Sequence, residues 1–442
     1  MNFKILAKGA THLTVKRFLG PFWIRRRWLK KTQWLNREQL EQIQLELLRK
    51  LVRHCYDTVP FYRRIMDERA ITVKSIQTLD DIKQFPILDK KQVLAAGDTI
   101  VSEKYPKWMM TTGLTGGTTG SPLSLPRSLF SVSNEHAFVR RQWDWAGIGF
   151  MDQTAYLSGR VIVDADRSRG PLYAYDPFMM ELILSNYHLS PKMVPQFVEA
   201  MKRYRVKAII GYPSSIYFLA KSCLDLGLEI KLEAALTTSE TIDDVMRQTI
   251  TRAFGCKIFD FYGAAERVCY IFTCERGSYH VISEYGYTEF MPANSDEKNH
   301  RRLVATGFWN YGTPLIRYDI GDTAITSDKI CSCGRVFPVV ESISGRSGEF
   351  VRTPSGKEYA PTLLARVAKG ANNILESQIV QDQIDHITVR YVPGKQFTDK
   401  DHKHFLEHML CHLPSELKID LECVDTIERT KSGKFRFIVS KI

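Results

Sequence analysis

Short apolar segments alternate with amphipathic helical segments through the middle of this 442-residue chain. Strand-like runs lie at Lys207–Ile210, Ala234–Thr237 and Lys257–Phe261, and helix-like stretches lie at Pro195–Arg205 and Ile242–Phe254. Strands that alternate with helices are typical of a β-sheet covered by helices, because each apolar face must be buried against another layer. We therefore predict the α/β class, with a large N-terminal α/β domain whose helices pack on β-sheets.

Two further patterns suggest the domain boundaries. Apolar residues recur at helical spacing from Glu38 to Arg69, which predicts one long amphipathic helix. After Gly345 the pattern changes to shorter strand-like pieces and one helix near Asp399–Leu413. We predict a large domain over residues 38–344 and a small, mobile α+β domain over residues 345–442.

The first 37 residues carry most of the chain's net charge. They contain ten Lys or Arg and no Asp or Glu, so the other residues hold only +2 of the total of +12. A protein that binds nucleic acid spreads basic residues over its folded body, and no nucleic-acid partner is therefore predicted. The cations are mixed with Trp23, Trp28 and Trp34, a combination that suits an anionic membrane surface.

We predict that residues 1–37 form a basic, aromatic arm that contacts the membrane peripherally from its cytoplasmic side. The alternatives are a solvated arm, an arm folded on its own body, and a dimer contact. No run approaches the roughly 18 apolar residues of a spanning helix, and the start of the chain does not read as a secretory signal. A cytoplasmic protein is the resulting expectation.

A Thr/Gly-rich segment, Thr115–Pro122 with the sequence TGGTTGSP, interrupts all regular periodicity. Glycines let backbone N–H groups approach an anion closely, and the threonine and serine hydroxyls add further donors. The segment lacks the lysine of a Walker loop. It is either a phosphate-binding loop or a flexible surface loop.

Three more motifs follow this loop in a fixed order. They are FYGAAE at Phe261–Glu266, IRYDIGD at Ile316–Asp322, and Gly345-Arg346 together with RTKSGK at Arg429–Lys434. With the loop, these motifs resemble the adenylate-forming superfamily of acyl-CoA ligases, adenylation domains and luciferases. The segments VPFY, FPIL, GYPS and TSE resemble, more narrowly, its phenylacetate-CoA ligase branch; they begin at Val59, Phe85, Gly211 and Thr238.

The resemblance implies a nucleotide site. The loop residues would cover the β- and γ-phosphates of ATP; they are Thr115, Gly116, Gly117, Thr118, Thr119 and Gly120. Tyr262 would stack on adenine, with Ser239 and Glu240 beside it, and Gly263 is a further predicted nucleotide-binding residue. Asp322 would accept both ribose hydroxyls, since one carboxylate offers two oxygens to a vicinal diol.

The resemblance also implies the catalytic groups. Glu266 would bind Mg²⁺, a hard cation that takes carboxylate and phosphate oxygens together. Arg346 would assist at the ribose or the α-phosphate. Lys434, on the small domain, would reach the substrate carboxylate and the bridging phosphate oxygen, so Lys434, Glu266 and Thr118 are the predicted catalytic residues.

The implied reaction joins a small-molecule carboxylic acid to AMP and then passes the acyl group to an acceptor, usually coenzyme A. The sequence departs from the family in three places. Leu123 follows Pro122 where many members have lysine, and Gly348 stands at the hinge where members usually have an acidic residue. Val351–Tyr359 reads as a polar hairpin in place of a Gly-rich tunnel segment. This variant is similar to members in bacterial polysaccharide biosynthesis, whose acceptor need not be coenzyme A. The alternative is a catalytically degenerate relative that acts as a nucleotide- or membrane-binding scaffold.

A second constellation is Cys274, His280, Cys331 and Cys333. Three thiolates and an imidazole complete a tetrahedral structural Zn²⁺ site, and Cys269 is the substitute if Cys274 is not the ligand. Reduced cysteines in loops are the alternative, since a C-x-C pair is less diagnostic than C-x-x-C.

Overall fold

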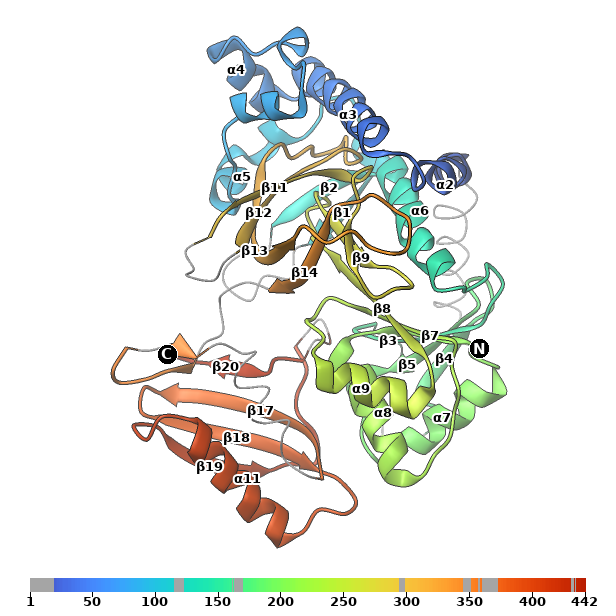
Figure 1. Ribbon diagram of the computed structural model, residues 1–442, viewed down its shortest axis with the longest axis vertical. Helices are drawn as coiled ribbons and strands as arrows, with labels where there is room; N and C mark the ends of the chain where they lie inside the picture. Colours follow the sequence, from blue (N-terminus) through green and yellow to red (C-terminus); the bar gives the residue numbers. More distant parts are fainter. Residues whose placement is uncertain are drawn as a thin grey trace. The chain divides into compact units, whose positions relative to one another are not determined.

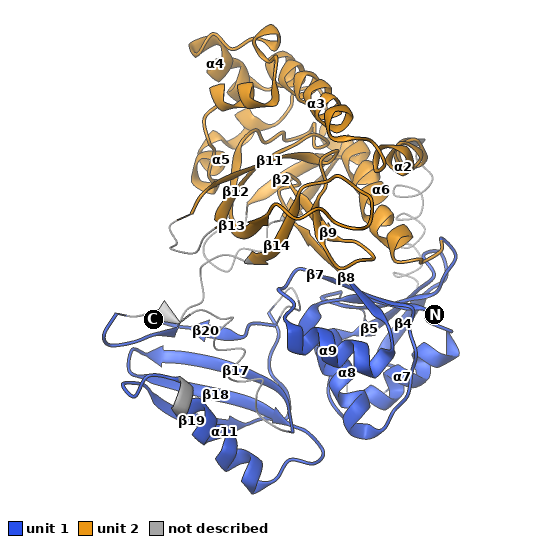
Figure 2. Cartoon of the chain, in the orientation of Figure 1, with its two compact units in different colours: residues 1–6, 150–258, 347–442 blue, residues 7–149, 259–346 orange. Residues whose placement is uncertain are grey.

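The computed structural model describes residues 20–114, 123–160, 162, 170–293, 299–344, 351–356, 358–359, 373–430, 433 and 435–442. These residues form two compact units (Figures 1 and 2). Unit 1 holds the described residues of 150–258 and 347–442, and unit 2 holds those of 7–149 and 259–346. The predicted α/β class is confirmed, as is a small C-terminal domain with a sheet of its own.

A mostly parallel run of strands forms the first part of unit 1. The strands lie in the order β7-β6-β3-β5-β4, and only the contact of β4 with β5 in this run is antiparallel. Three helices pack their apolar faces on these strands, in a core that includes Leu157, Phe197 and Ile250. The elements are β3 (Thr154–Ser158), β4 (Tyr173–Asp176), β5 (Glu181–Ser185), α7 (Val194–Arg203), β6 (Ala208–Gly211), α8 (Pro213–Leu226), β7 (Ala234–Thr238) and α9 (Asp244–Phe254).

The C-terminal part of unit 1 has its own four-stranded sheet, in the order β19-β18-β17-β20. Helix α11 contributes Phe405 and Met409 to the core beneath this sheet. The predicted hairpin is present, because β15 pairs antiparallel with β16. The elements are β15 (Val351–Arg352), β16 (Glu358–Tyr359), β17 (Ile374–Gln383), β18 (His386–Pro393), α11 (Asp399–His412), β19 (Lys418–Cys423) and β20 (Ile438–Ser440).

Unit 2 is built on antiparallel strands in the order β11-β12-β13-β14-β10-β9-β8, with a separate β1–β2 pair. The strands are β1 (Met110–Leu114), β2 (Ser124–Ser128), β8 (Lys257–Gly263), β9 (Tyr270–Thr273), β10 (Tyr279–Val281), β11 (Gly286–Pro292), β12 (His300–Gly307), β13 (Tyr318–Ser327) and β14 (Val339–Ser344). The longer helices are α2 (Gly20–Thr32), α3 (Arg37–Thr58), α4 (Pro60–Glu68), α5 (Lys90–Ala96) and α6 (Leu129–Trp145). Short 3₁₀ turns are η2 (Val73–Ser75), η3 (Leu79–Gln84), η4 (Gly97–Ile100) and η5 (Lys107–Met109) in unit 2, and η6 (Asn186–His188) in unit 1.

The predicted single helix from Glu38 to Arg69 is in fact two helices, α3 and α4. Val59 between them is extended, with φ −125° and ψ 100°, and Pro60 opens α4. Proline disfavours helical geometry in the residue before it and cannot donate a backbone hydrogen bond, so the helix ends and restarts here. Among the described residues, no helix combines the length and apolarity needed to cross a bilayer.

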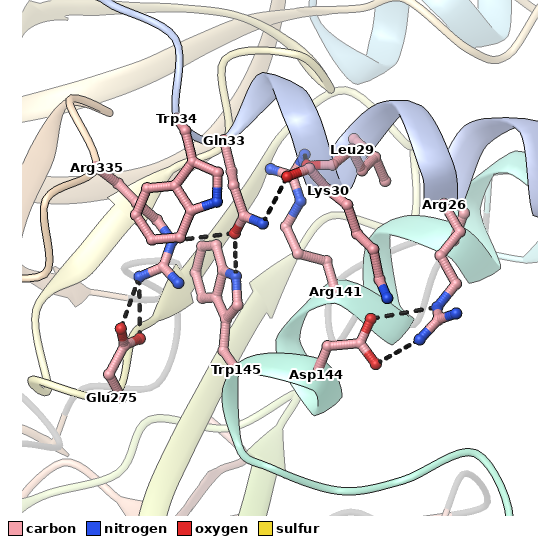
Figure 3. Close-up of a pocket in the computed structure, with 11 residues that line it drawn as sticks. Arg26, Leu29, Lys30, Gln33, Trp34, Arg141, Asp144, Trp145, Glu275 and Arg335 are labelled. Carbon is pink, nitrogen blue, oxygen red and sulfur yellow. Dashed lines mark hydrogen bonds and ion pairs between the residues drawn. The ribbon is translucent and has the colours of Figure 1, made fainter.

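Helix α2 packs against α6 (Figure 3). Its buried face carries Phe22 and Leu29. Arg26 on the same helix forms an ion pair of 3.0 Å with Asp144 on α6. The part of the basic N-terminal segment that the structure describes is therefore helical and attached to the body of unit 2.

Candidate functional site

The parallel strands of unit 1 end at one edge of their sheet, because neighbouring parallel strands point the same way. Asn186 follows β5, the Tyr212–Ser214 segment follows β6, and Ser239 and Glu240 follow β7. The carboxyl edge of an open parallel sheet is the usual place for a ligand in α/β proteins. Ser239 has φ of +72°, a left-handed conformation that is uncommon for a residue with a side chain.

Glu240 joins two backbone segments at this edge. Its Oε2 accepts a hydrogen bond of 3.1 Å from the N–H of Ser214, in the first turn of α8. The first amides of a helix have no partner within the helix, and the positive end of its dipole favours a carboxylate. Oε1 of the same residue accepts a bond of 3.0 Å from the N–H of Phe435, in the C-terminal part of unit 1.

Asn186 makes a second contact with the C-terminal segment. Its Nδ2 donates a hydrogen bond of 2.7 Å to the carbonyl oxygen of Gly433. Gly433 has φ of +75°, and a Cβ there would overlap the Cα of Gly159, so only glycine fits. The carboxyl edge of unit 1 thus binds Gly433 of the predicted SGK turn, while Ser432 and Lys434 lie outside the described residues.

In unit 2 the residue predicted to bind adenine contacts the residue predicted to bind ribose. The hydroxyl of Tyr262, at the end of β8, donates a hydrogen bond of 2.6 Å to Oδ2 of Asp322 on β13. Burial, followed by the charge of Asp322, raises the pKa of Tyr262 well above its ordinary value, so the phenol stays protonated. The ring of this neutral phenol suits a nucleobase, and the carboxylate beside it suits a ribose diol.

Glu266 is buried, with 3% of its surface exposed. The hydroxyl of Tyr318 donates a hydrogen bond of 3.0 Å to its Oε1. The IRYDIGD motif therefore supplies two residues of the site: Tyr318, which binds the predicted magnesium ligand Glu266, and Asp322. A carboxylate oriented in this way fits the preference of Mg²⁺ for hard oxygen donors.

Arg317, in the same motif, is a supporting residue that sequence reasoning did not single out. Its guanidinium donates to both carboxylate oxygens of Glu289, at 2.9 Å each, and at 2.8 Å to the carbonyl of Phe85. These bonds fix the start of β13, which carries Asp322. The sequence feature that could have identified Arg317 is its position next to Tyr318 in the IRYDIGD motif.

Some predicted nucleotide residues lie outside the described residues; they are Thr115, Gly116, Gly117, Thr118, Thr119, Gly120 and Arg346. The strands that flank the Thr/Gly segment, β1 and β2, pair antiparallel. Arg127 on β2 donates from Nη2 to the carbonyl of Ala265, which precedes Glu266. Strand β2 is thereby tied to the FYGAAE motif, and burial lowers the pKa of Arg127 to about 10.

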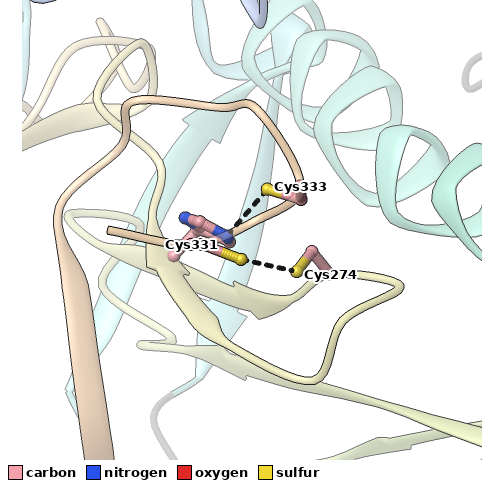
Figure 4. A group of neighbouring side chains, drawn as sticks. Cys274, Cys331 and Cys333 are labelled. Carbon is pink, nitrogen blue, oxygen red and sulfur yellow. Dashed lines mark hydrogen bonds between the residues drawn. The ribbon is translucent and has the colours of Figure 1, made fainter. Parts of the chain in front are cut away.

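The four predicted metal ligands lie together in unit 2 (Figure 4). One ligand atom from each lies within 4.8 Å of the others; the residues are Cys274, His280, Cys331 and Cys333. The Sγ atoms of Cys274 and Cys331 are 3.6 Å apart, and Sγ of Cys333 is 3.4 Å from Nε2 of His280. A tetrahedral zinc site with ordinary bond lengths requires separations of about 3.8 Å between sulfurs and about 3.5 Å from sulfur to nitrogen. The donor set and its spacing fit Zn²⁺.

Electrostatics also favour a metal at this cluster. Burial lowers the pKa of His280 to about 4, so its imidazole is neutral, as a metal ligand must be. Burial raises the pKa of the Cys274 thiol to about 12, and a dication would offset the cost of a buried thiolate. Cys269, the predicted substitute ligand, is not in the cluster, and its sulfur accepts a hydrogen bond of 3.4 Å from Thr288.

Comparisons with known proteins show what this chain is similar to. Residues 351–441 match the family model described as the CapK C-terminal domain. Protein CapK of Staphylococcus aureus is 25% identical over 390 residues, which cover 86% of this chain and 85% of CapK. A phenylacetate-coenzyme A ligase of Thermus thermophilus is 25% identical over 341 residues, which cover 72% of each chain.

The fold matches that of solved acyl-CoA ligases. A crystal structure of 2-hydroxyisobutyryl-CoA ligase in the postadenylation state aligns with a TM-score of 0.69 and 18% identity, covering 92% of this chain and 91% of that one. The predicted resemblance is confirmed: the homologues are phenylacetate-CoA ligases and CapK, and the structural neighbours are acyl-CoA ligases of the adenylate-forming superfamily.

Proposed function

We propose that this chain is an AMP-forming ligase, which uses ATP to activate a small-molecule carboxylic acid as an acyl adenylate and then transfers the acyl group. One observation carries the proposal. Asn186 and Glu240, at the carboxyl edge of the parallel strands, bind the backbone of Gly433 and Phe435, the sequence neighbours of Lys434. Because its neighbours are held at an edge that commonly binds ligands, Lys434 suits the role that the resemblance implies, which is to reach the substrate carboxylate and the bridging phosphate oxygen.

In the first half-reaction, a carboxylate oxygen of the acid bonds to the α-phosphorus of ATP. The bond from that phosphorus to the oxygen bridging to the β-phosphate breaks, and pyrophosphate leaves. A carboxylate is a weak nucleophile facing a polyanion, so positioning and cationic stabilisation dominate catalysis. Lys434 supplies a cation, Tyr262 and Asp322 hold the nucleoside, and Glu266 would hold Mg²⁺, whose charge would offset that of the phosphates when it is bound.

In the second half-reaction, an acceptor such as the thiol of coenzyme A loses its proton and bonds to the acyl carbon. The bond from that carbon to the phosphate oxygen breaks, and AMP leaves. The contacts of Asn186 and Glu240 with the C-terminal segment are hydrogen bonds to backbone atoms, each of modest net strength, so the turn can leave once the adenylate is made. Mobility of the small domain is part of this proposal.

The acceptor is either coenzyme A or a nucleophile of polysaccharide assembly. The similarity to phenylacetate-coenzyme A ligase supports the first, and the match of residues 351–441 to the CapK C-terminal domain supports the second. The hairpin of β15 and β16, which stands where the Gly-rich tunnel segment was expected, also favours an acceptor other than coenzyme A.

We further propose that Cys274, His280, Cys331 and Cys333 hold one structural Zn²⁺. All four tetrahedral positions would be filled by protein atoms, which leaves no open position for substrate. The ion would stabilise the loops that follow β9 and precede β14.

The experiment is acid-dependent exchange of labelled pyrophosphate into ATP, measured over a panel of aryl, fatty, amino and sugar acids. The proposal predicts exchange with at least one acid class and dependence on Mg²⁺. A chain that binds ATP but supports no exchange with any of these acids is the degenerate scaffold, and the ligase proposal then fails.

A further inference from the structure

Helix α2 has a solvent-facing surface that is both apolar and basic. Trp23 and Ile24 are 45% and 72% exposed, and Trp34, just beyond the helix, is 57% exposed. Arg27, Lys30 and Lys31 are exposed on the same side at helical spacing. We call these six residues the α2 face.

The opposite side of α2 is fixed to unit 2. Phe22 and Leu29 are buried there, and the Arg25 guanidinium lies 3.5 Å from the ring centroid of Trp309. Thr32 donates a hydrogen bond of 2.7 Å to Glu284. The helix is therefore already folded and attached, and its stability within unit 2 does not require large apolar side chains on the α2 face.

The charges of the α2 face differ from those next to it. Arg26, Arg141 and Arg335 each form an ion pair, with Asp144, Glu284 and Glu275 respectively. Within the part of the chain that the structure describes, Arg27, Lys30 and Lys31 have no carboxylate at ion-pair distance. Three uncompensated cations therefore surround exposed tryptophan and isoleucine.

A pocket of about 470 Å³ opens beside this face (Figure 3). Lys30 and Arg26 extend from α2 into it, and Arg335 lies between the rings of Trp34 and Trp145, with its guanidinium 4.8 and 4.1 Å from their centroids. Four of its lining residues are basic and two are acidic; the basic residues are Arg26, Lys30, Arg141 and Arg335. Arg26, Arg141 and Arg335 are paired with carboxylates, so Lys30 is the lining cation that remains for a small anion among the described residues.

We propose that the α2 face docks on an anionic phospholipid bilayer, and that the pocket receives the phosphate of one headgroup beside Lys30. Trp23, Ile24 and Trp34 enter the interfacial region, where tryptophan is favoured, and the cations contact lipid phosphates. Charge complementarity identifies the occupant: exposed cations alone would suit many polyanions, but their mixture with Ile24 and two tryptophans suits a surface with an apolar layer beneath its charge. The inference is independent of the proposed ligase activity.

The test is sedimentation of the full chain with vesicles of phosphatidylcholine alone or mixed with phosphatidylglycerol. We expect salt-sensitive binding to the mixed vesicles only. Each cation near an anionic surface changes partitioning about fivefold, so Arg27→Gln, Lys30→Gln and Lys31→Gln together should lower it about a hundredfold. Trp23→Ser with Ile24→Ser should weaken binding while leaving the charge unchanged.

The matched control is Lys50→Gln with Lys74→Gln, two exposed cations elsewhere in unit 2. It should reduce binding much less than Lys30→Gln with Lys31→Gln, which removes the same charge. Melting temperatures of the variants verify that the fold is intact. Absence of binding by the unmodified chain, equal effects of the two double variants, or tighter binding to duplex DNA of equal phosphate concentration would overturn the proposal.

Discussion

The side-chain amide of Asn186 donates a hydrogen bond of 2.7 Å to the carbonyl oxygen of Gly433. This bond joins the carboxyl end of β5 to a turn that lies almost 250 residues later in the chain. Glu240 makes the corresponding contact with the N–H of Phe435. Two side chains, one after β5 and one after β7, therefore hold the backbone next to the proposed catalytic lysine.

Replacing Asn186 with alanine should slow adenylation more than acyl transfer. The carbonyl of Gly433 would lose its donor, at a cost of about 1–3 kcal/mol, which corresponds to a loss of about 5- to 160-fold in the first half-reaction. Pyrophosphate exchange measures the first step, and reaction of a synthetic acyl adenylate with the acceptor measures the second. Gln153→Ala, which removes an amide bonded to Tyr175 in the same unit, is the control. Equal losses in both steps would mean that Asn186 is only structural.

Gly433→Ala should have a larger effect on the same step. The new Cβ would be strained at φ +75° and would overlap Gly159, so the turn could not take this position. Gly433 is buried against Gly159, but the substitution removes no apolar side chain and the turn can move away, so the melting temperature should change little while pyrophosphate exchange falls sharply. Gly356→Ala, at a positive φ with open space around it, is the matched control. Undiminished exchange in Gly433→Ala would show that this docked position is not used in adenylation.

Arg317→Met should destabilise unit 2. It leaves the buried carboxylate of Glu289 without its guanidinium partner, which costs about 3–5 kcal/mol. The melting temperature measured by calorimetry should fall, and Glu289→Gln in the same background should recover part of the loss because it removes the unpaired charge. A variant as stable as the original chain would contradict the anchoring role of this pair.

The zinc proposal predicts that the Cys331→Ser, Cys333→Ser double variant loses about one zinc ion per chain and melts at a lower temperature. A metal bound only by the folded state stabilises that state, and serine hydroxyls are poor zinc ligands. Elemental analysis of protein purified without added metal provides the measurement. Cys423→Ser, an exposed thiol outside the cluster, should retain the metal. Unchanged zinc content in the double variant would exclude these ligands.

Local patterns predicted several of the elements. Short apolar runs identified β6, β7 and β8, and turn residues identified the hairpin of β15 and β16. Proline at position 60 was visible, yet helical periodicity on both sides concealed the break between α3 and α4. The cations of α2 hid its buried face, because Arg25 packs on Trp309 and Arg26 pairs with Asp144, both more than 100 positions away in the sequence.

The candidate site was predictable where a sequence motif itself includes the functional side chains. The contact of Tyr262 with Asp322 joins two such motifs, and the Cys/His cluster joins two more. Asn186 belongs to no recognisable sequence motif. Its role arises from the position of β5 beside β3 and from its hydrogen bond to a turn that is distant in the sequence. Positions of this kind depend on strand order, which the spacing of residues in a sequence does not encode.

Lys434→Ala tests the central claim most directly, with Lys441→Ala, an exposed lysine near the C-terminus, as the matched control. Acid-dependent pyrophosphate exchange and acyl transfer from a synthetic adenylate are measured on the same preparations. We expect Lys434→Ala to lose exchange by about a hundred- to a thousandfold, as for removal of one transition-state charge partner, while transfer stays near that of the original chain. Equal loss of both half-reactions, or exchange that survives the substitution, would contradict the proposed role of Lys434 in adenylation.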